Sequence, residues 1–249
     1  SVDGAPNDWQ LMHLGRLAIG GCGIVFGEET AVEPDGRKTH NCAGLYKQSH
    51  VASYRKITDM IRSNGALPAI QLGHSGRKGS CHDAMRDWRA LNNSDAENDL
   101  PPWQVMTPTA ALSPPRPIPH KEMDQDDINR VVDDFRTATK RSIDAGYDIV
   151  EVHGAHGYLI HQFLSATSNQ REDNYGGSLA NRMRFAVEVA AAVREVWPKE
   201  RPVFFRLSAV DGKGGSWTLA DSISLAATLR EVGIDMIDVS SGGITGSSN

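Results

Sequence analysis

The sequence predicts an α/β fold built on a parallel sheet. Short apolar runs alternate with longer segments of helical periodicity, which is the pattern of successive βα units. Each apolar run ends in polar residues, as expected for buried parallel strands whose carboxyl ends open into a site. A weak internal repeat, AGYDIVEVH at 145–153 and VGIDMIDVS at 232–240, also indicates repeated βα units. The expected strands are residues 23–29, 68–74, 147–154, 203–209 and 234–241.

Helices are expected between these strands. Residues 49–63 and 126–145 each place apolar side chains on one face, and a glycine follows each segment as a stop signal. A third helix holds Phe185, Val189 and Val193, and a fourth follows residue 218. The expected N-caps are Ser49, Ser178 and Thr218, the last in a capping box with Asp221. Five strands in this order fit either a closed barrel or a doubly wound sheet.

Bulk properties limit the class of protein. A chain of 249 residues can form one barrel-sized domain, and a net charge of −5 argues against a nucleic-acid surface. No apolar run approaches the roughly 20 residues that span a bilayer, and the first residues lack the features of a signal peptide. Three cysteines without CxxC spacing favour reduced thiols. We therefore expect a soluble, cytoplasmic protein without nucleic-acid or membrane partners.

The segment at about 80–123 interrupts the βα rhythm. It contains LPPW and TPTAALSPPRPIP together with many polar residues. Such a segment is too long for a simple connection and is typical of a cap over the strand ends. We expect residues 1–249 to form one domain that carries this capping insertion.

The stretch EVHGAHGY predicts a reactive cluster at the end of the third strand. His153 ends the strand, and His156 and Tyr158 follow on the next turn. Two imidazole N–H groups at this spacing can hold a carbonyl or phenolate oxygen, and a tyrosine of ordinary pKa is a proton donor at neutral pH. A metal site is the alternative, but it needs a third ligand, and His161 lies too far along a helix. Polar residues without chemistry are the third interpretation.

Two more polar residues interrupt apolar strands. Arg206 is a candidate for binding an anionic ligand, because a buried arginine is costly without one; pairing with Glu151 is the structural alternative. Gln71 can donate to and accept from the edge of a heterocycle. Glu28 and Glu29 end the first strand, where a ligand contact and a solvated strand end are equally compatible. No GxGxxG follows a strand and no P-loop motif is present.

Four motifs in order resemble the Old Yellow Enzyme family of flavin-dependent NAD(P)H:enone oxidoreductases, especially its thermophilic-like ene-reductases. They are GEETAVEPDGR, AIQLGHSGRKGS, HGAHGYLIHQFLSATSNQREDNYGGSLANRMRF and FFRLSAVDG, and they extend over nearly the whole chain. The resemblance implies a (β/α)8 TIM barrel with FMN at the carboxyl ends of the strands, NADPH or NADH as reductant, and an α,β-unsaturated carbonyl compound as substrate. A homo-oligomer is compatible with it.

The resemblance also implies roles for individual residues. His153 and His156 match the pair that binds the substrate carbonyl, and Tyr158 matches the tyrosine that protonates Cα while hydride passes from flavin N5 to Cβ. Gln71 and Arg206 match residues that contact the flavin ring, and Glu29 falls where the backbone contacts FMN. No metal is implied.

The chain departs from the family pattern at both ends. The family's first strand is expected before Ser1, and its last two βα units, with the FMN phosphate site, are expected after Asn249. The resemblance therefore implies an incomplete barrel. Gln10 replaces a more usual histidine. Three alternatives remain open: a 2,4-dienoyl-CoA reductase-like or oxygenase-fused member of the family, a non-catalytic fragment of the fold, and a metal-dependent hydrolase.

Overall fold

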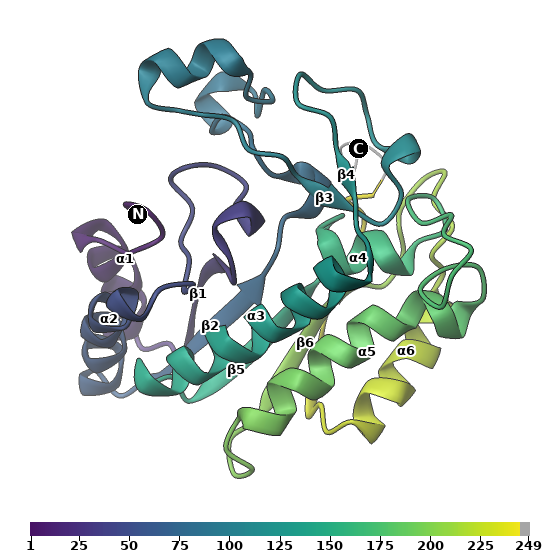
Figure 1. Ribbon diagram of the computed structural model, residues 1–249. Coiled ribbons are helices and arrows are strands. Elements are labelled where there is room, and N and C mark those ends of the chain that lie inside the picture. The colour runs from purple at the N-terminus through teal and green to yellow at the C-terminus, as the bar shows by residue number, and fades with distance from the viewer. Residues whose placement is uncertain (245–249) are drawn as a thin grey trace.

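Five parallel strands form the central sheet of the computed structural model, which describes residues 1–244 (Figure 1). The strands are β1 (Ile24–Ala31), β2 (Leu67–Gly73), β5 (Ile149–Gly154), β6 (Val203–Ser208) and β7 (Met236–Ser240). They lie in the order β1-β2-β5-β6-β7, and every neighbouring pair is parallel. The five strands predicted from the sequence are thus confirmed, and each connection crosses over to the adjacent strand.

Helices follow the strands as predicted, with two additions. The α-helices are α1 (Asp8–Ile19), α2 (Val51–Ser63), α3 (Gln125–Asp144), α4 (Leu159–Leu164), α5 (Leu179–Val196) and α6 (Leu219–Glu231). Short 3-10 turns are η1 (Pro34–Gly36), η2 (Gln48–His50) and η3 (Gly76–Lys78). No helix within residues 1–244 is both long and apolar enough to cross a membrane.

The predicted helix caps can be compared one by one. The Ser178 side chain accepts from the Asn181 amide, and Thr218 and Asp221 form a capping box, so both predictions are confirmed. The prediction that Ser49 is an N-cap is wrong. Residues 48–50 form η2, which runs directly into α2, and neither element has a side-chain cap. A serine inside a helical turn is not in the extended conformation that capping requires.

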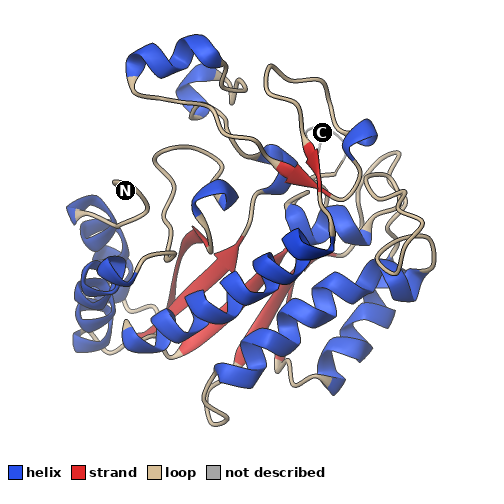
Figure 2. Cartoon of the chain, in the orientation of Figure 1, coloured by secondary structure: helices blue, strands red, loops and turns tan. Residues whose placement is uncertain are grey.

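The two faces of the sheet differ. Figure 2 shows helices along one face, and there Val150, Val152 and Phe205 join the main hydrophobic core. Because side chains alternate between faces along a strand, the neighbouring residues lie on the other face. A small apolar layer on that face consists of Phe26, Ala69, Ile149 and Phe204. Polar side chains follow this layer toward the carboxyl ends, which is how the interior of a parallel barrel is filled.

The segment 80–123, called the lid segment below, has little regular structure. It holds η4 (Ala84–Arg86), η5 (Asn93–Asn98), η6 (Ala110–Leu112) and a short parallel pair, β3 (Met106–Thr107) with β4 (Lys121–Glu122). Trp103 Nε1 donates to the Asp35 carbonyl, in the loop after β1. Arg171, in the loop between α4 and α5, donates to two carbonyls of the lid segment. These contacts attach it to loops that follow the carboxyl ends of the strands.

Candidate active site

Three ring side chains meet at the carboxyl end of β5. The ring centroids of His153 and His156 are 5.2 Å apart, and those of His153 and Tyr158 are 5.0 Å apart in an edge-to-face arrangement. His153 is the last residue but one of β5, and Tyr158 directly precedes α4. The structure therefore brings together the cluster that the sequence spacing predicts.

Serines from two neighbouring strands fix His156. Its backbone amide donates to Ser208 Oγ at 3.0 Å, and its Nε2 lies 2.6 Å from Ser240 Oγ, where either atom can donate. Ser208 ends β6 and Ser240 ends β7. His156 also adopts a left-handed backbone conformation, with φ of 56°. This conformation is uncommon outside glycine and is frequent at functional sites.

The loop that carries His156 is packed against the loop after β7. A Cβ on Gly157, whose φ is 70°, would lie 2.1 Å from the Gly243 carbonyl oxygen. A Cβ on Gly243 would lie 2.4 Å from the Cα of His156. Only glycine fits at either position, so the backbone of this site is set by direct contact between two loops.

Lys78, which the sequence did not indicate as a site residue, joins the same two loops. Its Nζ donates to the His156 and Gly243 carbonyls at 2.6 Å each. Burial lowers the pKa of the Lys78 ammonium to about 8, and the nearby charges of Lys38 and Arg77 act in the same direction. Lys78 therefore carries a positive charge beside the histidine pair at neutral pH.

Two buried histidines hold the loops around the cluster in the same way. His161 Nδ1 accepts from the Gly157 amide, and its Nε2 donates to Asp211 at 2.8 Å. His74 Nδ1 accepts from the Gly76 amide, and its Nε2 donates to Glu33 at 2.8 Å. Because each Nδ1 accepts, the proton of each neutral ring is on Nε2.

This pairing also bears on the metal alternative. His161 is turned toward Asp211, away from the ring cluster. Within residues 1–244, no group of three or more His, Cys, Asp and Glu side chains is arranged to hold a metal ion.

All three ring side chains are neutral at pH 7. His153 is 4% exposed, and burial lowers its pKa to about 3, with the proximity of His156 and of the Arg206 cation adding to the effect. Burial also lowers the pKa of His156 and raises that of the Tyr158 phenol. The cluster thus holds two imidazole rings and a protonated phenol. Neutral N–H and O–H donors that converge at one point can stabilise a developing oxyanion and donate a proton.

Polar side chains also lie on the neighbouring strands β2, β5, β6 and β7, close to the ring cluster in the strand register. Gln71 donates to Glu151 at 2.7 Å, and burial raises the pKa of Glu151 to about 7. Arg206 lies opposite His153 in the strand register, and its Nε is 3.2 Å from Asp238. The carboxylate partner considered for Arg206 in the sequence, Glu151, is therefore replaced by Asp238, which the register places on the adjacent strand.

Glu29 lies opposite Gln71 in the register of β1 and β2. Burial raises the pKa of its carboxyl to about 8, so it is mostly protonated at neutral pH. A cavity of about 360 Å³ has both Glu29 and Tyr158 in its wall. Buried atoms without a hydrogen-bond partner include Glu29 Oε1 and His153 Nδ1. Unpaired buried polar atoms are rare, and a ligand with several polar edge atoms would satisfy them.

Proton donors and a cation at the carboxyl ends of parallel strands are typical of the ligand sites of α/β-barrel enzymes. Sequence comparison identifies the group of enzymes. The chain belongs to the NADH:flavin oxidoreductase / NADH oxidase family, the Old Yellow Enzyme family, whose model matches residues 1–247.

The curated relatives of this chain are described as flavin oxidoreductases or NADPH dehydrogenases, and they are longer than this chain. The chain is 38% identical to the NADH:flavin oxidoreductase FG08077 of Gibberella zeae, with 97% of this chain and 61% of the relative covered. It is also 38% identical to an NADPH dehydrogenase of Clostridium acetobutylicum, with 97% and 66% covered. The chain thus spans slightly less than two thirds of the length of these relatives.

A solved structure supports the fold assignment. The Old Yellow Enzyme homologue from Zymomonas mobilis superposes with a TM-score of 0.78 at 25% identity, and the match covers 96% of this chain and 65% of that structure. The five parallel strands and their helices therefore correspond to about two thirds of a TIM barrel of this family.

Proposed function

We propose that this chain provides the substrate site and part of the flavin site of an FMN-dependent NAD(P)H oxidoreductase that reduces the C=C bond of α,β-unsaturated carbonyl compounds. The observation that carries the proposal is the cluster of His153, His156 and Tyr158 at the end of β5. Family membership supplies the flavin and nicotinamide chemistry. The choice of an enone as substrate rests on the donors in the cluster.

The histidine pair suits a carbonyl oxygen. Both rings are neutral at pH 7, so each carries one N–H; His156 can donate its N–H to a ligand from Nδ1 when its Nε2 accepts from the Ser240 hydroxyl. His156 is held by Ser208 and Ser240, which fixes the direction of its ring before a ligand arrives. Donors that are fixed in advance stabilise the enolate charge that develops during reduction at little reorganisation cost.

Tyr158 suits protonation of Cα. Burial raises the pKa of its phenol, so the proton stays in place until a strongly basic carbon requires it. The edge-to-face contact with His153 holds the phenol beside the oxygen-binding pair. The phenol therefore donates its proton close to the carbonyl-binding donors, as a general acid would.

The polar side chains on the strands fit FMN. Gln71 carries both a donor and an acceptor, Arg206 is a cation beside Asp238, and Glu29 Oε1 is buried without a hydrogen-bond partner. These groups would hold the polar edge of the flavin ring, with the Arg206 cation near the atoms that become negative on reduction. Bound FMN would supply the hydride.

The experiment compares Tyr158→Phe with the parent chain. After addition of FMN, NADPH-dependent reduction of cyclohexenone is followed in single turnovers. The variant is expected to reduce the enone about 10²-fold to 10⁴-fold more slowly, the usual contribution of a positioned general acid.

Tyr175→Phe is the matched control, because Tyr175 is also buried but donates to Glu188 on α5. It should reduce cyclohexenone at the parent rate. Equal enone reduction by Tyr158→Phe and the parent would remove Tyr158 as the proton donor, and a parent without turnover would favour the non-catalytic alternative.

A further inference from the structure

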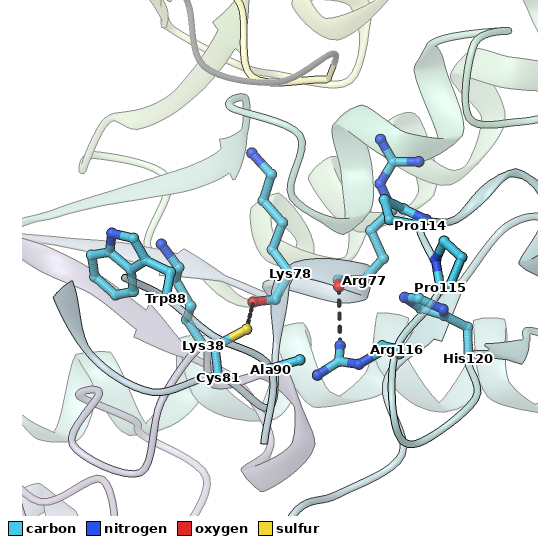
Figure 3. Close-up of a pocket in the computed structure, with 10 residues that line it drawn as sticks. All are labelled: Lys38, Arg77, Lys78, Cys81, Trp88, Ala90, Pro114, Pro115, Arg116 and His120. Carbon is cyan, nitrogen blue, oxygen red and sulfur yellow. Dashed lines mark hydrogen bonds between the residues drawn. The ribbon is translucent and has the colours of Figure 1, made fainter. Parts of the chain in front are cut away.

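A second cavity, beside the first, is lined by cations. It has a volume of about 370 Å³ and lies between the loop after β1, the loop after β2 and the lid segment. Figure 3 shows Lys38 beside Trp88 on one side and Arg116 with His120 on the other. Its charged lining residues are Lys38, Arg77, Lys78 and Arg116. Among the described residues, no aspartate or glutamate lines it, although the chain as a whole carries a net charge of −5.

The four cations have only neutral partners. Arg77 and Lys78 donate to backbone carbonyls, and Arg116 donates to the Arg77 and Ser80 carbonyls. The Lys38 ammonium lies over the Trp88 ring, 3.3 Å from its centroid. None of the four has an ion pair with a carboxylate in the part of the chain that the structure describes. No ion pair within residues 1–244 therefore neutralises the positive charge that lines the cavity.

This arrangement is costly without an anion. Burial lowers the pKa values of Lys38 and Lys78, and Arg77 and Lys38 further disfavour the charge on Lys78. His120 is kept neutral in the same environment, because burial and Arg116 lower its pKa to about 4. Arg116 Nε is also buried without a hydrogen-bond partner. Like charges held together at a partly buried site are stabilised when an anion enters.

We propose that this cavity, the lid pocket, binds the phosphate groups of a nucleotide tail carried by a molecule that reacts at the ring cluster. Four cations exceed the single charge of a carboxylate, whereas a phosphate monoester alone carries about −1.5 to −2 at pH 7. Arginine forks and lysine ammonium groups are the usual partners of phosphate oxygens. Trp88, 46% exposed, adds an aromatic surface at the rim.

Lys78 connects the lid pocket to the ring cluster. Its ammonium lines the pocket and donates to the carbonyl of His156. A molecule whose reactive end lies at the histidine pair therefore has a short path to the lid pocket. Delivery to the ring cluster rests on the proposed function, whereas phosphate binding itself does not.

Two sources of such a tail share this chemistry. NADPH carries a diphosphate and a 2′-phosphate on its adenosine, and an enoyl-CoA thioester carries a diphosphate and a 3′-phosphate. Both are anionic and both end in a group that suits the ring cluster. The common ligand chemistry is an adenosine phosphate with additional phosphate charge.

The test is titration calorimetry of the chain with inorganic pyrophosphate, without added flavin. Saturable binding is expected, and it should weaken as salt is added because exposed charges are screened. Lys38→Gln and Arg116→Gln should each weaken it about 10-fold to 100-fold, the loss expected for a charge-assisted hydrogen bond. Arg230→Gln, an equal charge change on the exposed face of α6, should bind as the parent does.

Two variants are needed because Arg116 also ties parts of the lid segment together. Within the described residues, the Lys38 ammonium contacts the lid segment through the Trp88 ring and donates to none of its carbonyls, so Lys38→Gln removes the charge and no hydrogen bond of the lid segment. Absence of saturable binding at millimolar pyrophosphate would overturn the lid pocket. Equal affinity of both variants and the parent would do the same.

Titration with 2′,5′-ADP and 3′,5′-ADP then separates the sources. Tighter binding of 2′,5′-ADP supports NADPH as the ligand, and tighter binding of 3′,5′-ADP supports a CoA thioester. If 2′,5′-ADP and 3′,5′-ADP bind with equal affinity, and both more tightly than pyrophosphate, the result supports recognition of the adenosine phosphate that the two sources share. Because these measurements need no turnover, failure of the Tyr158→Phe prediction and failure of the lid pocket are distinguishable.

Discussion

Acidification is predicted to destabilise the fold through His153. Burial lowers the pKa of this histidine from an ordinary value near 6.5 to about 3. Between these values the unfolded chain binds a proton that the folded chain does not, so the free energy of unfolding falls as the pH falls. From pH 7 to pH 5, the linkage relation gives a loss of about 2 kcal/mol from His153 alone.

The assay is urea unfolding followed by tryptophan fluorescence at pH 7 and pH 5, for the parent and for His153→Gln. The other histidines whose pKa burial lowers, His156 and His161 among them, titrate in both proteins, so their contributions cancel in the comparison. The variant should lose about 2 kcal/mol less than the parent over this interval. His13→Gln, on α1, should behave as the parent does. The same pH dependence in the parent and His153→Gln would refute a buried, neutral His153.

Three further substitutions test the packing around the site, each by the urea concentration at the midpoint of unfolding. Asp211→Asn should cost about 2 to 4 kcal/mol of unfolding free energy, because the Asp211 carboxylate accepts hydrogen bonds from His161 Nε2–H and from two backbone amides, and the NH2 group of asparagine would face one of these donors. An unchanged midpoint would contradict the assigned tautomer of His161. Gly154→Ala should cost about 1 to 3 kcal/mol, since its Cβ would lie 2.4 Å from Phe205 Cε1, and a more stable variant would show that the ring has room to move. Thr218→Ala should cost about 1 kcal/mol through the lost cap of α6; no loss would mean that the capping box contributes little.

Much of the fold could be predicted because the signals are local. The strands are apolar runs of five to eight residues that end in polar groups, and the helices α2, α3, α5 and α6 carry one-sided apolar patterns. Helix α1 was missed because DWQLMHLGRLAI has apolar side chains on several faces and a glycine inside. Helix α4 has six residues, all buried, so it has no polar face to reveal its period.

The candidate site was predictable only where it is contiguous in sequence. His153, His156 and Tyr158 lie within six residues, so a strand end followed by a turn is enough to bring them together. Ser208 and Ser240 come from strands far along the chain, and only their position at strand ends could have indicated them.

The partners of the basic residues were harder to predict. The pairing of Arg206 with Asp238 in place of Glu151 depends on which strands are neighbours and in which register. The cations of the lid pocket come from three separate segments of the chain. No local pattern in the sequence specifies either arrangement.

The close contact between Gly157 and Gly243 has a consequence for how this site can change. Neither residue contributes a side chain, yet any larger residue at either position would push two loops apart and move His156. In a library of all single substitutions, positions 157 and 243 should tolerate less than position 41, where an exposed asparagine lines the same cavity as Tyr158. Variation that alters substrate preference is therefore easiest along the cavity walls, while the backbone that presents the histidines stays fixed.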